Sequence, residues 1–115
     1  MNNNIPLFKV FMSEEVPTEV GKVLMSGFVG EGPKVKEFES KLKGFIGNDK
    51  LITVNSATSS LHLSLHLMKK PNGEWSGLKD GDEVLSCPLT CTATNWPILA
   101  NNLNIKWVDA DRDTC

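Results

Sequence analysis

The stretch LITVNSATSSLHL, residues 51–63, decides the fold. Its first four residues form a short apolar and β-branched run, which is typical of a buried strand. Asn55 and Ser56 follow at once as a turn and a helix cap. An apolar stripe with spacing i, i+4 and i+7, beginning at Leu61, then indicates a helix. The stretch therefore predicts a strand that leads directly into a helix.

Two amphipathic helices are expected before this stretch, over residues 14–26 and 34–46, because apolar side chains recur there at helical spacing. The segment GFVGEGP, residues 27–33, separates them. Its glycines and its proline disfavour regular structure, so we expect a shaped loop.

Two further strands are predicted after it, over residues 83–86 and 104–108, with a helix over residues 94–101 between them. Pro97 fits only the first turn of that helix. Turn-rich segments at residues 71–73 and 79–82 mark surface connections. Strands that alternate with helices predict an α/β fold with βαβ units, parallel pairing and ligands beyond the carboxyl ends of the strands.

A chain of 115 residues with 40% hydrophobic content is expected to form a single unit over residues 1–115. Within that unit, residues 1–49 hold the first helices and the glycine loop, and residues 50–115 begin the α/β sheet. The sheet is expected to be incomplete.

Charge and cysteine content exclude several classes of protein. The 12 basic and 14 acidic residues form no basic patch, so nucleic acid is not an expected partner. The N-terminus resembles neither a signal peptide nor a membrane anchor, and we expect a cytoplasmic protein. Cys87, Cys91 and Cys115 are an odd set that favours free thiols.

The segment from Ser56 through Ala57 to Thr58 is the most informative for function. A helix that starts here exposes free backbone N–H groups, and the helix dipole adds partial positive charge. Two hydroxyls stand beside these groups, so a phosphate is a natural occupant. Ser and Thr are also ordinary N-caps, and on spacing alone capping is the more economical interpretation.

The order of motifs resembles the DegT/DnrJ/EryC1/StrS family of sugar aminotransferases, whose members have the aspartate-aminotransferase (type I) fold. Four blocks carry the resemblance: GFVGEGP at residues 27–33, NSATSSLHL at 55–63, GDEV at 81–84, and PLTCTATN at 88–95 followed by VDAD at 108–111. The resemblance covers nearly the whole chain and matches the N-terminal portion of the family's large domain.

The resemblance implies a pyridoxal 5'-phosphate cofactor, with Ala57 and Thr58 at the positions that bind its phosphate; the helix start adds Ser56 as a candidate cofactor-binding residue. Cys91 stands where the family usually carries an aromatic residue that stacks on the cofactor ring. The glycine loop corresponds to a family segment near the sugar-nucleotide pocket, often serving a neighbouring subunit. Implied partners are a keto-sugar nucleotide, an amino-acid donor and a second copy of the chain in a homo-oligomer, such as a dimer.

No catalytic residue is assigned within the chain. The family's Schiff-base lysine lies in a later segment, so we expect the chain to be inactive alone. The lysines at positions 34, 36, 41, 43, 69 and 70 are expected to face solvent. Two alternatives stay open: a non-catalytic βαβ interaction module, and a fragment of a family dehydratase that carries histidine in place of the lysine.

Three patterns suggest metal or redox chemistry but are better explained otherwise. His62 and His66 share a helical face without a third ligand, so packing is expected. The aspartates at 109, 111 and 113 are interpreted as a polar turn, because an EF-hand loop cannot be completed. Cys87 and Cys91 are not spaced as CxxC. We predict no metal site.

Overall fold

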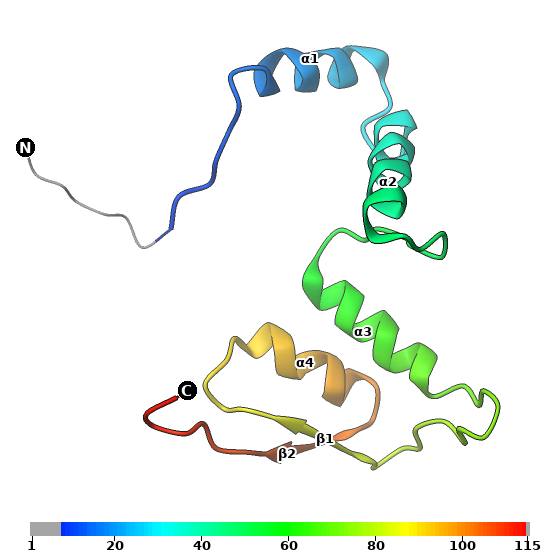
Figure 1. Ribbon diagram of the computed structural model, residues 1–115, viewed down its shortest axis with the longest axis vertical. Coiled ribbons are helices and arrows are strands. Elements are labelled where there is room, and N and C mark those ends of the chain that lie inside the picture. Colours follow the sequence, from blue (N-terminus) through cyan, green and yellow to red (C-terminus); the bar gives the residue numbers. More distant parts are fainter. Residues whose placement is uncertain (1–7, 115) are drawn as a thin grey trace, which may run out of the picture. The chain divides into compact units, whose positions relative to one another are not determined.

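The computed structural model describes residues 8–114. The chain divides into two compact units, Met1–Thr53 and Val54–Cys115. In the second unit, a βαβ arrangement confirms the α/β fold that the sequence predicts. Figure 1 shows the order of the elements along the chain.

The first unit contains two helices, α1 (Val16–Ser26) and α2 (Pro33–Ile46), close to the expected ranges. Each has a proline in its first turn, where no backbone N–H is needed. Each ends at a glycine in the left-handed conformation, Gly27 and Gly47. The prolines and glycines that bound both helices can therefore be recognised in the sequence.

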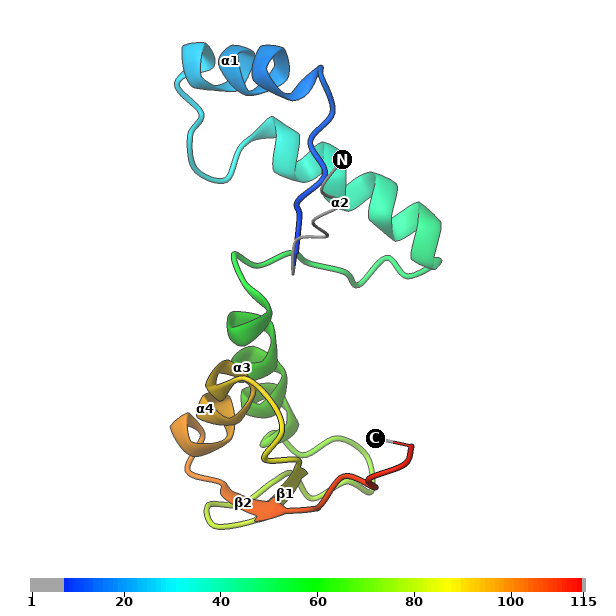
Figure 2. The ribbon, with the colours of Figure 1, turned by 90° about the vertical axis from the view of Figure 1, so that its left-hand side faces the viewer.

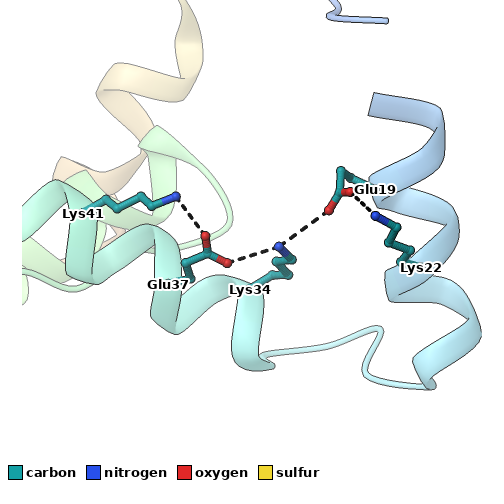
Figure 3. Close-up of polar contacts among 5 residues, drawn as sticks. All are labelled: Glu19, Lys22, Lys34, Glu37 and Lys41. Atoms are coloured by element: carbon teal, nitrogen blue, oxygen red, sulfur yellow. Dashed lines mark hydrogen bonds and ion pairs between the residues drawn. The ribbon is translucent and has the colours of Figure 1, made fainter. Parts of the chain in front are cut away.

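Charged side chains link α1 to α2 across the glycine loop (Figure 3). The Lys34 Nζ lies 3.1 Å from Glu37 and 3.6 Å from Glu19. The hydrogen bond to Glu37 raises the pKa of Lys34, and the Glu19 carboxylate adds to the effect. These side chains are exposed, so the ion pairs contribute little to stability.

The second unit begins with α3 (Ala57–Met68), followed by β1 (Glu83–Ser86), α4 (Thr92–Ala100) and β2 (Asn104–Trp107). The two strands pair in parallel, with Glu83 opposite Asn104 and Ser86 opposite Trp107. This confirms the predicted pairing. Figure 2 shows α3 and α4 side by side over the strand pair.

The core of the second unit lies where α4 turns into β2. Ile98 and Leu103 are 4% and 2% exposed, and Pro97 is also fully buried. The Leu103 N–H donates to the Ile98 carbonyl at 3.1 Å, which closes the turn between the two elements. Asn101 is buried beside them, and its Nδ2 donates to the carbonyls of Pro97 at 2.8 Å and His62 at 3.2 Å. This amide joins α4 to α3.

The predicted position of Pro97 in the first turn of its helix is wrong. The helix begins at Thr92, two residues before the expected start, so Pro97 lies in its interior. Pro97 has no N–H to offer the carbonyl four residues earlier. The Pro97 ring is buried in the core, and its carbonyl accepts a hydrogen bond from Asn101 Nδ2.

The predicted strand over residues 51–54 is also absent from the described part of the chain. Residues 51–54 form no regular element and pair with no strand in this part of the chain. The Thr53 N–H instead donates to the Glu39 side chain, at 2.7 Å from Oε1. A strand needs a neighbouring strand to accept its backbone N–H groups. Here the Glu39 side chain accepts the Thr53 N–H instead.

Candidate functional site

The N-terminus of α3 exposes backbone hydrogen-bond donors. Ser56 is its N-cap, with an extended backbone (φ −159°, ψ 157°), and its Oγ accepts the Ser59 N–H at 3.1 Å. The Ser60 N–H donates to the Ser56 carbonyl at 3.1 Å. The N–H groups of Ala57 and Thr58 have no acceptor within the helix, as is general for a first turn. Two amides and the positive end of the helix dipole are therefore available together.

The hydroxyl groups around this terminus have divided roles. Ser56 Oγ donates to Ser59 Oγ at 3.0 Å, and Ser59 Oγ donates to Asn55 Oδ1 at 2.8 Å. Ser56 is thus engaged in capping, whereas the Thr58 hydroxyl contacts no hydrogen-bond partner among residues 8–114. Of the two predicted hydroxyl donors, Thr58 is the one left free for a ligand.

The first turn of α3 carries no acidic residue. A phosphate group would therefore meet backbone amides, a hydroxyl and the helix dipole without a carboxylate to repel it. The residues present fit a phosphate group.

An open hollow of about 460 Å³ runs from this terminus along α3. Its lining comes from α3 and α4: Thr58, Ser59, His62, Leu63, His66 and Trp96. The His62 and Trp96 rings lie 5.3 Å apart between centroids. His62 therefore packs against α4, as predicted, whereas the packing predicted for His66 is wrong, because this side chain is exposed. Within residues 8–114 no group of three or more metal-ligating side chains is assembled.

Cys91 is the N-cap of α4 and is exposed, with no hydrogen bond from its side chain to the helix. It follows β1 by five residues and is not among the residues that line the hollow at Thr58. Two hydrogen bonds hold the surrounding loop: Ser86 Oγ to Asn95 Oδ1 at 2.5 Å and Thr90 Oγ1 to Thr94 Oγ1 at 3.2 Å. Cys91 therefore stands on a well-defined helix start, next to the carboxyl end of a strand.

The thiols of Cys87 and Cys91 are free, as expected. Cys115 lies outside the described residues. The predicted polar turn near the C-terminus is confirmed, because Asp111 Oδ1 accepts the N–H groups of Asp113 at 3.0 Å and Thr114 at 2.8 Å.

The expected solvent exposure holds for Lys34 and Lys41, whose side chains are 58% and 76% exposed, and for Lys36 and Lys70, whereas Lys43 is half-buried. It is wrong for Lys69, which is 25% exposed, pairs with Asp80 and donates to the Asn101 carbonyl at 2.9 Å. This ammonium ties the end of α3 to the end of α4. Lys69 and Ser56 flank opposite ends of a 12-residue helix, about 20 Å apart by helical rise.

The glycine loop of the first unit borders a separate hollow. Its apolar lining includes Phe28, Val29 and Pro33, and Lys22 and Lys34 stand at its border. A Cβ on Gly32 would lie 3.0 Å from the Cβ of Phe28, a tight contact that Phe28 would have to relieve by a small shift.

The sequence offered no signal for the contact of Glu39 with Thr53. Glu39 Oε1 accepts both the Thr53 N–H at 2.7 Å and the Thr53 hydroxyl at 2.9 Å. These donated hydrogen bonds hold the pKa of Glu39 below its usual value, with a smaller contribution from the Lys43 charge. The partners are 14 residues apart, so helical periodicity alone could not have paired them.

No helix within residues 8–114 is both long and apolar enough to span a bilayer.

The model of the DegT/DnrJ/EryC1/StrS aminotransferase family matches residues 11–115. The solved sugar aminotransferase CalS13 of Micromonospora echinospora is 47% identical, with a TM-score of 0.77 over 94% of this chain and 27% of that protein. Spr1654 of Streptococcus pneumoniae, a proposed sugar aminotransferase solved in its PLP form, is 33% identical, with a TM-score of 0.78 over 96% and 26%.

Among curated proteins, the spore coat polysaccharide biosynthesis protein SpsC of Bacillus subtilis (strain 168) is 32% identical over 113 residues. That match covers 98% of this chain and 27% of SpsC. The chain therefore spans about a quarter of the length of the relatives it matches.

Proposed function

Because the chain belongs to the DegT/DnrJ/EryC1/StrS aminotransferase family, we propose that it forms the segment of a pyridoxal-phosphate-dependent sugar aminotransferase that holds the cofactor phosphate. The whole enzyme would move an amino group from an amino-acid donor to a keto-sugar nucleotide. The observation that carries the proposal is the start of α3, where the N–H groups of Ala57 and Thr58 are free beside the Thr58 hydroxyl.

When bound, pyridoxal phosphate supplies an electron sink for carbanion chemistry. In this proposal the residues of this chain bind the phosphate group of the cofactor and orient it. The amides of Ala57 and Thr58 donate to phosphate oxygens, the Thr58 hydroxyl adds a third donor, and Ser56 keeps the helix start in place by capping Ser59. Fixed donors of this kind set the position of the cofactor without reorganisation.

We propose no catalytic role for Lys34, Lys41 or Lys69. The first two are exposed on α2, and the third is held by Asp80 and the Asn101 carbonyl at the far end of α3. The 115-residue chain is therefore expected to bind the phosphate end of the cofactor without catalysing transamination.

Replacing Ala57 by proline is expected to weaken binding of pyridoxamine 5'-phosphate by about tenfold, because it removes one N–H donor to an ionised group. Proline is well tolerated in the first helical position, and the extended Ser56 backbone suits a following proline, so α3 should persist. Thr58→Val, which removes the hydroxyl, is expected to weaken binding as well. A fluorescence titration of the chain measures both effects.

Pyridoxamine 5'-phosphate is the appropriate probe because it has no aldehyde to react with surface lysines. Pyridoxamine, which lacks the phosphate, is the control: its affinity should be weak and should not change in either variant. Equal affinity of the original chain for the two compounds would refute a phosphate site at α3.

We propose further that Cys91 lies against the cofactor ring, as a polarizable contact without a π-face. Pyridoxamine 5'-phosphate should then slow alkylation of Cys91 by iodoacetamide several-fold, as followed by mass spectrometry, whereas inorganic phosphate should not. Cys87, which is partly buried, is the internal reference. Protection of both thiols to the same degree, or of neither, would count against this placement.

A further inference from the structure

We propose that Asn101 is a positioning residue for the cofactor site, because its buried amide fixes α3 against α4. The phosphate donors proposed above, Ala57 and Thr58, begin one of these helices, and Cys91 caps the start of the other. This inference rests on that proposed function. Asn101 itself is the C-cap of α4, at the opposite end from Cys91, so it would act on the cofactor only through the two helices.

One amide group of Asn101 serves both helices. The residue is 4% exposed, and its Nδ2 donates to the Pro97 carbonyl of α4 at 2.8 Å and to the His62 carbonyl of α3 at 3.2 Å. An amide NH₂ has two donors, and here each helix supplies one acceptor. A buried amide that loses an acceptor is costly, so both contacts hold the helices at one spacing.

Lys69 adds a second link between α3 and the same residue. Its Nζ donates to the Asn101 carbonyl at 2.9 Å and also pairs with Asp80. Lys69 is the C-cap of α3, about two helical turns beyond His62. Two links at separate points along α3 fix its direction as well as its distance from α4.

The two helices run in the same direction, as Figure 2 shows. The Trp96 ring lies beside His62, and further along both helices Asn101 contacts Lys69. Contacts that follow the same order along two helices require parallel axes. The first turn of α3 and the Cys91 cap of α4 therefore lie at the same end of the helix pair.

The alignment of the helices matters because pyridoxamine 5'-phosphate carries its phosphate and its ring in one small molecule. The two contacts strengthen each other only when both can be made at once. A site whose parts move apart by a fraction of an ångström loses this advantage. Inorganic phosphate would meet only the amides of α3, so its binding does not depend on where Cys91 lies.

The test compares the affinities of the 115-residue chain for these two ligands, both followed at the Ala57 amide resonance. Asn101→Ala is expected to weaken binding of pyridoxamine 5'-phosphate about fivefold or more, the usual size of coupling between linked sites. Binding of inorganic phosphate should not change. The protection of Cys91 from iodoacetamide by pyridoxamine 5'-phosphate should be lost. A variant that is only less stable would instead lose both affinities by the same factor.

Asn104→Ala is the matched control. Its Nδ2 also donates to a backbone carbonyl, that of Gly81 at 2.9 Å, but this bond joins β2 to the connection before β1 and touches neither helix. Both affinities should stay as they are in the original chain.

Lys69→Met cuts the second link and keeps the inference testable if Asn101→Ala does not fold. The Lys69 side chain is 25% exposed, so its replacement leaves no unpaired amide in the core. We expect the same split as for Asn101→Ala: weaker binding of pyridoxamine 5'-phosphate and unchanged binding of inorganic phosphate.

The ring protons of His62 give a ligand-free measurement. The Trp96 ring, 5.3 Å away between centroids, displaces their NMR resonances through its ring current. Asn101→Ala should move these resonances towards the positions of an unpacked histidine, because α4 is then free to shift against α3. Asn104→Ala should leave them in place.

The inference is overturned if the folded variants Asn101→Ala and Lys69→Met bind pyridoxamine 5'-phosphate as the original chain does, or if they lose both affinities equally. The proposed function then stands, provided that Ala57→Pro still weakens binding. If the original chain shows no preference for pyridoxamine 5'-phosphate over pyridoxamine, the proposed function fails and takes this inference with it.

Discussion

Replacing Leu103 by alanine is expected to lower the free energy of unfolding of the second unit by about 3 kcal/mol. Leu103 is 2% exposed and follows the turn in which its N–H donates to the Ile98 carbonyl. Truncation removes buried apolar surface and leaves a cavity in the core of this unit. Few side chains in this unit are buried as deeply, so the loss is a large part of the unit's free energy of unfolding.

Leu99→Ala is the matched control, since it makes the same chemical change one residue after Ile98. The Leu99 side chain is 57% exposed, so its truncation should cost less than about 1 kcal/mol. Urea denaturation followed by tryptophan fluorescence and far-UV circular dichroism compares the two. Similar losses in both variants would show that the core is not where α4 meets β2.

Replacing Gly77 by alanine is expected to be equally severe, at about 3 kcal/mol or more, because two penalties act together. Gly77 has φ +76°, a left-handed conformation that costs a residue with a Cβ. In addition, a Cβ here would lie 2.3 Å from the Lys69 carbonyl oxygen, which is backbone and cannot rotate away. The connection from α3 to β1 would have to move.

Gly73→Ala separates the two penalties. Gly73 also has a positive φ, +58°, but a Cβ there would meet nothing within 4 Å. Only the conformational cost of about 1 kcal/mol should remain. The same denaturation measurement decides the matter, and equal effects at the two glycines would mean that the close approach of Gly77 to Lys69 does not exist in solution.

Much of this architecture follows from local patterns. Helical periodicity together with prolines and glycines at the ends predicted α1 and α2 to within two residues. Short apolar runs predicted β1 and β2, and the intervening helix implied their parallel pairing. These features depend on residues close together in the chain, so a single sequence is enough to predict them.

What the sequence misplaced depends on distant contacts. Residues 51–54 have the composition of a strand, but strand formation requires a neighbour, and Glu39 takes the Thr53 N–H instead. The start of α4 was expected too late, because Pro97 normally marks a first turn, whereas here its buried ring and the Asn101 hydrogen bond keep it inside the helix. Propensity was overridden by packing in both cases.

The candidate site shows the same division. Ser56 and Thr58 could be recognised from a strand-like run followed by small and hydroxyl residues, and the structure assigns capping to Ser56 and leaves Thr58 free. Contacts between residues 11 to 34 positions apart were not predicted: Trp96 with His62 beside the site, Lys69 with Asp80 at the far end of α3, and Glu39 with Thr53 in the first unit. No periodicity in a single sequence identifies such pairs.

The central claim is that the free amides at the start of α3 bind the phosphate group of the cofactor. Two-dimensional ¹H–¹⁵N NMR of the 115-residue chain, titrated with pyridoxamine 5'-phosphate and separately with pyridoxamine, tests it most directly. We predict that the amide resonances of Ala57 and Thr58 show the largest shifts, that they move downfield as charge-assisted hydrogen bonds form, and that they move only with the phosphorylated compound. Unchanged Ala57 and Thr58 resonances, with the largest shifts elsewhere in the chain, would contradict the account.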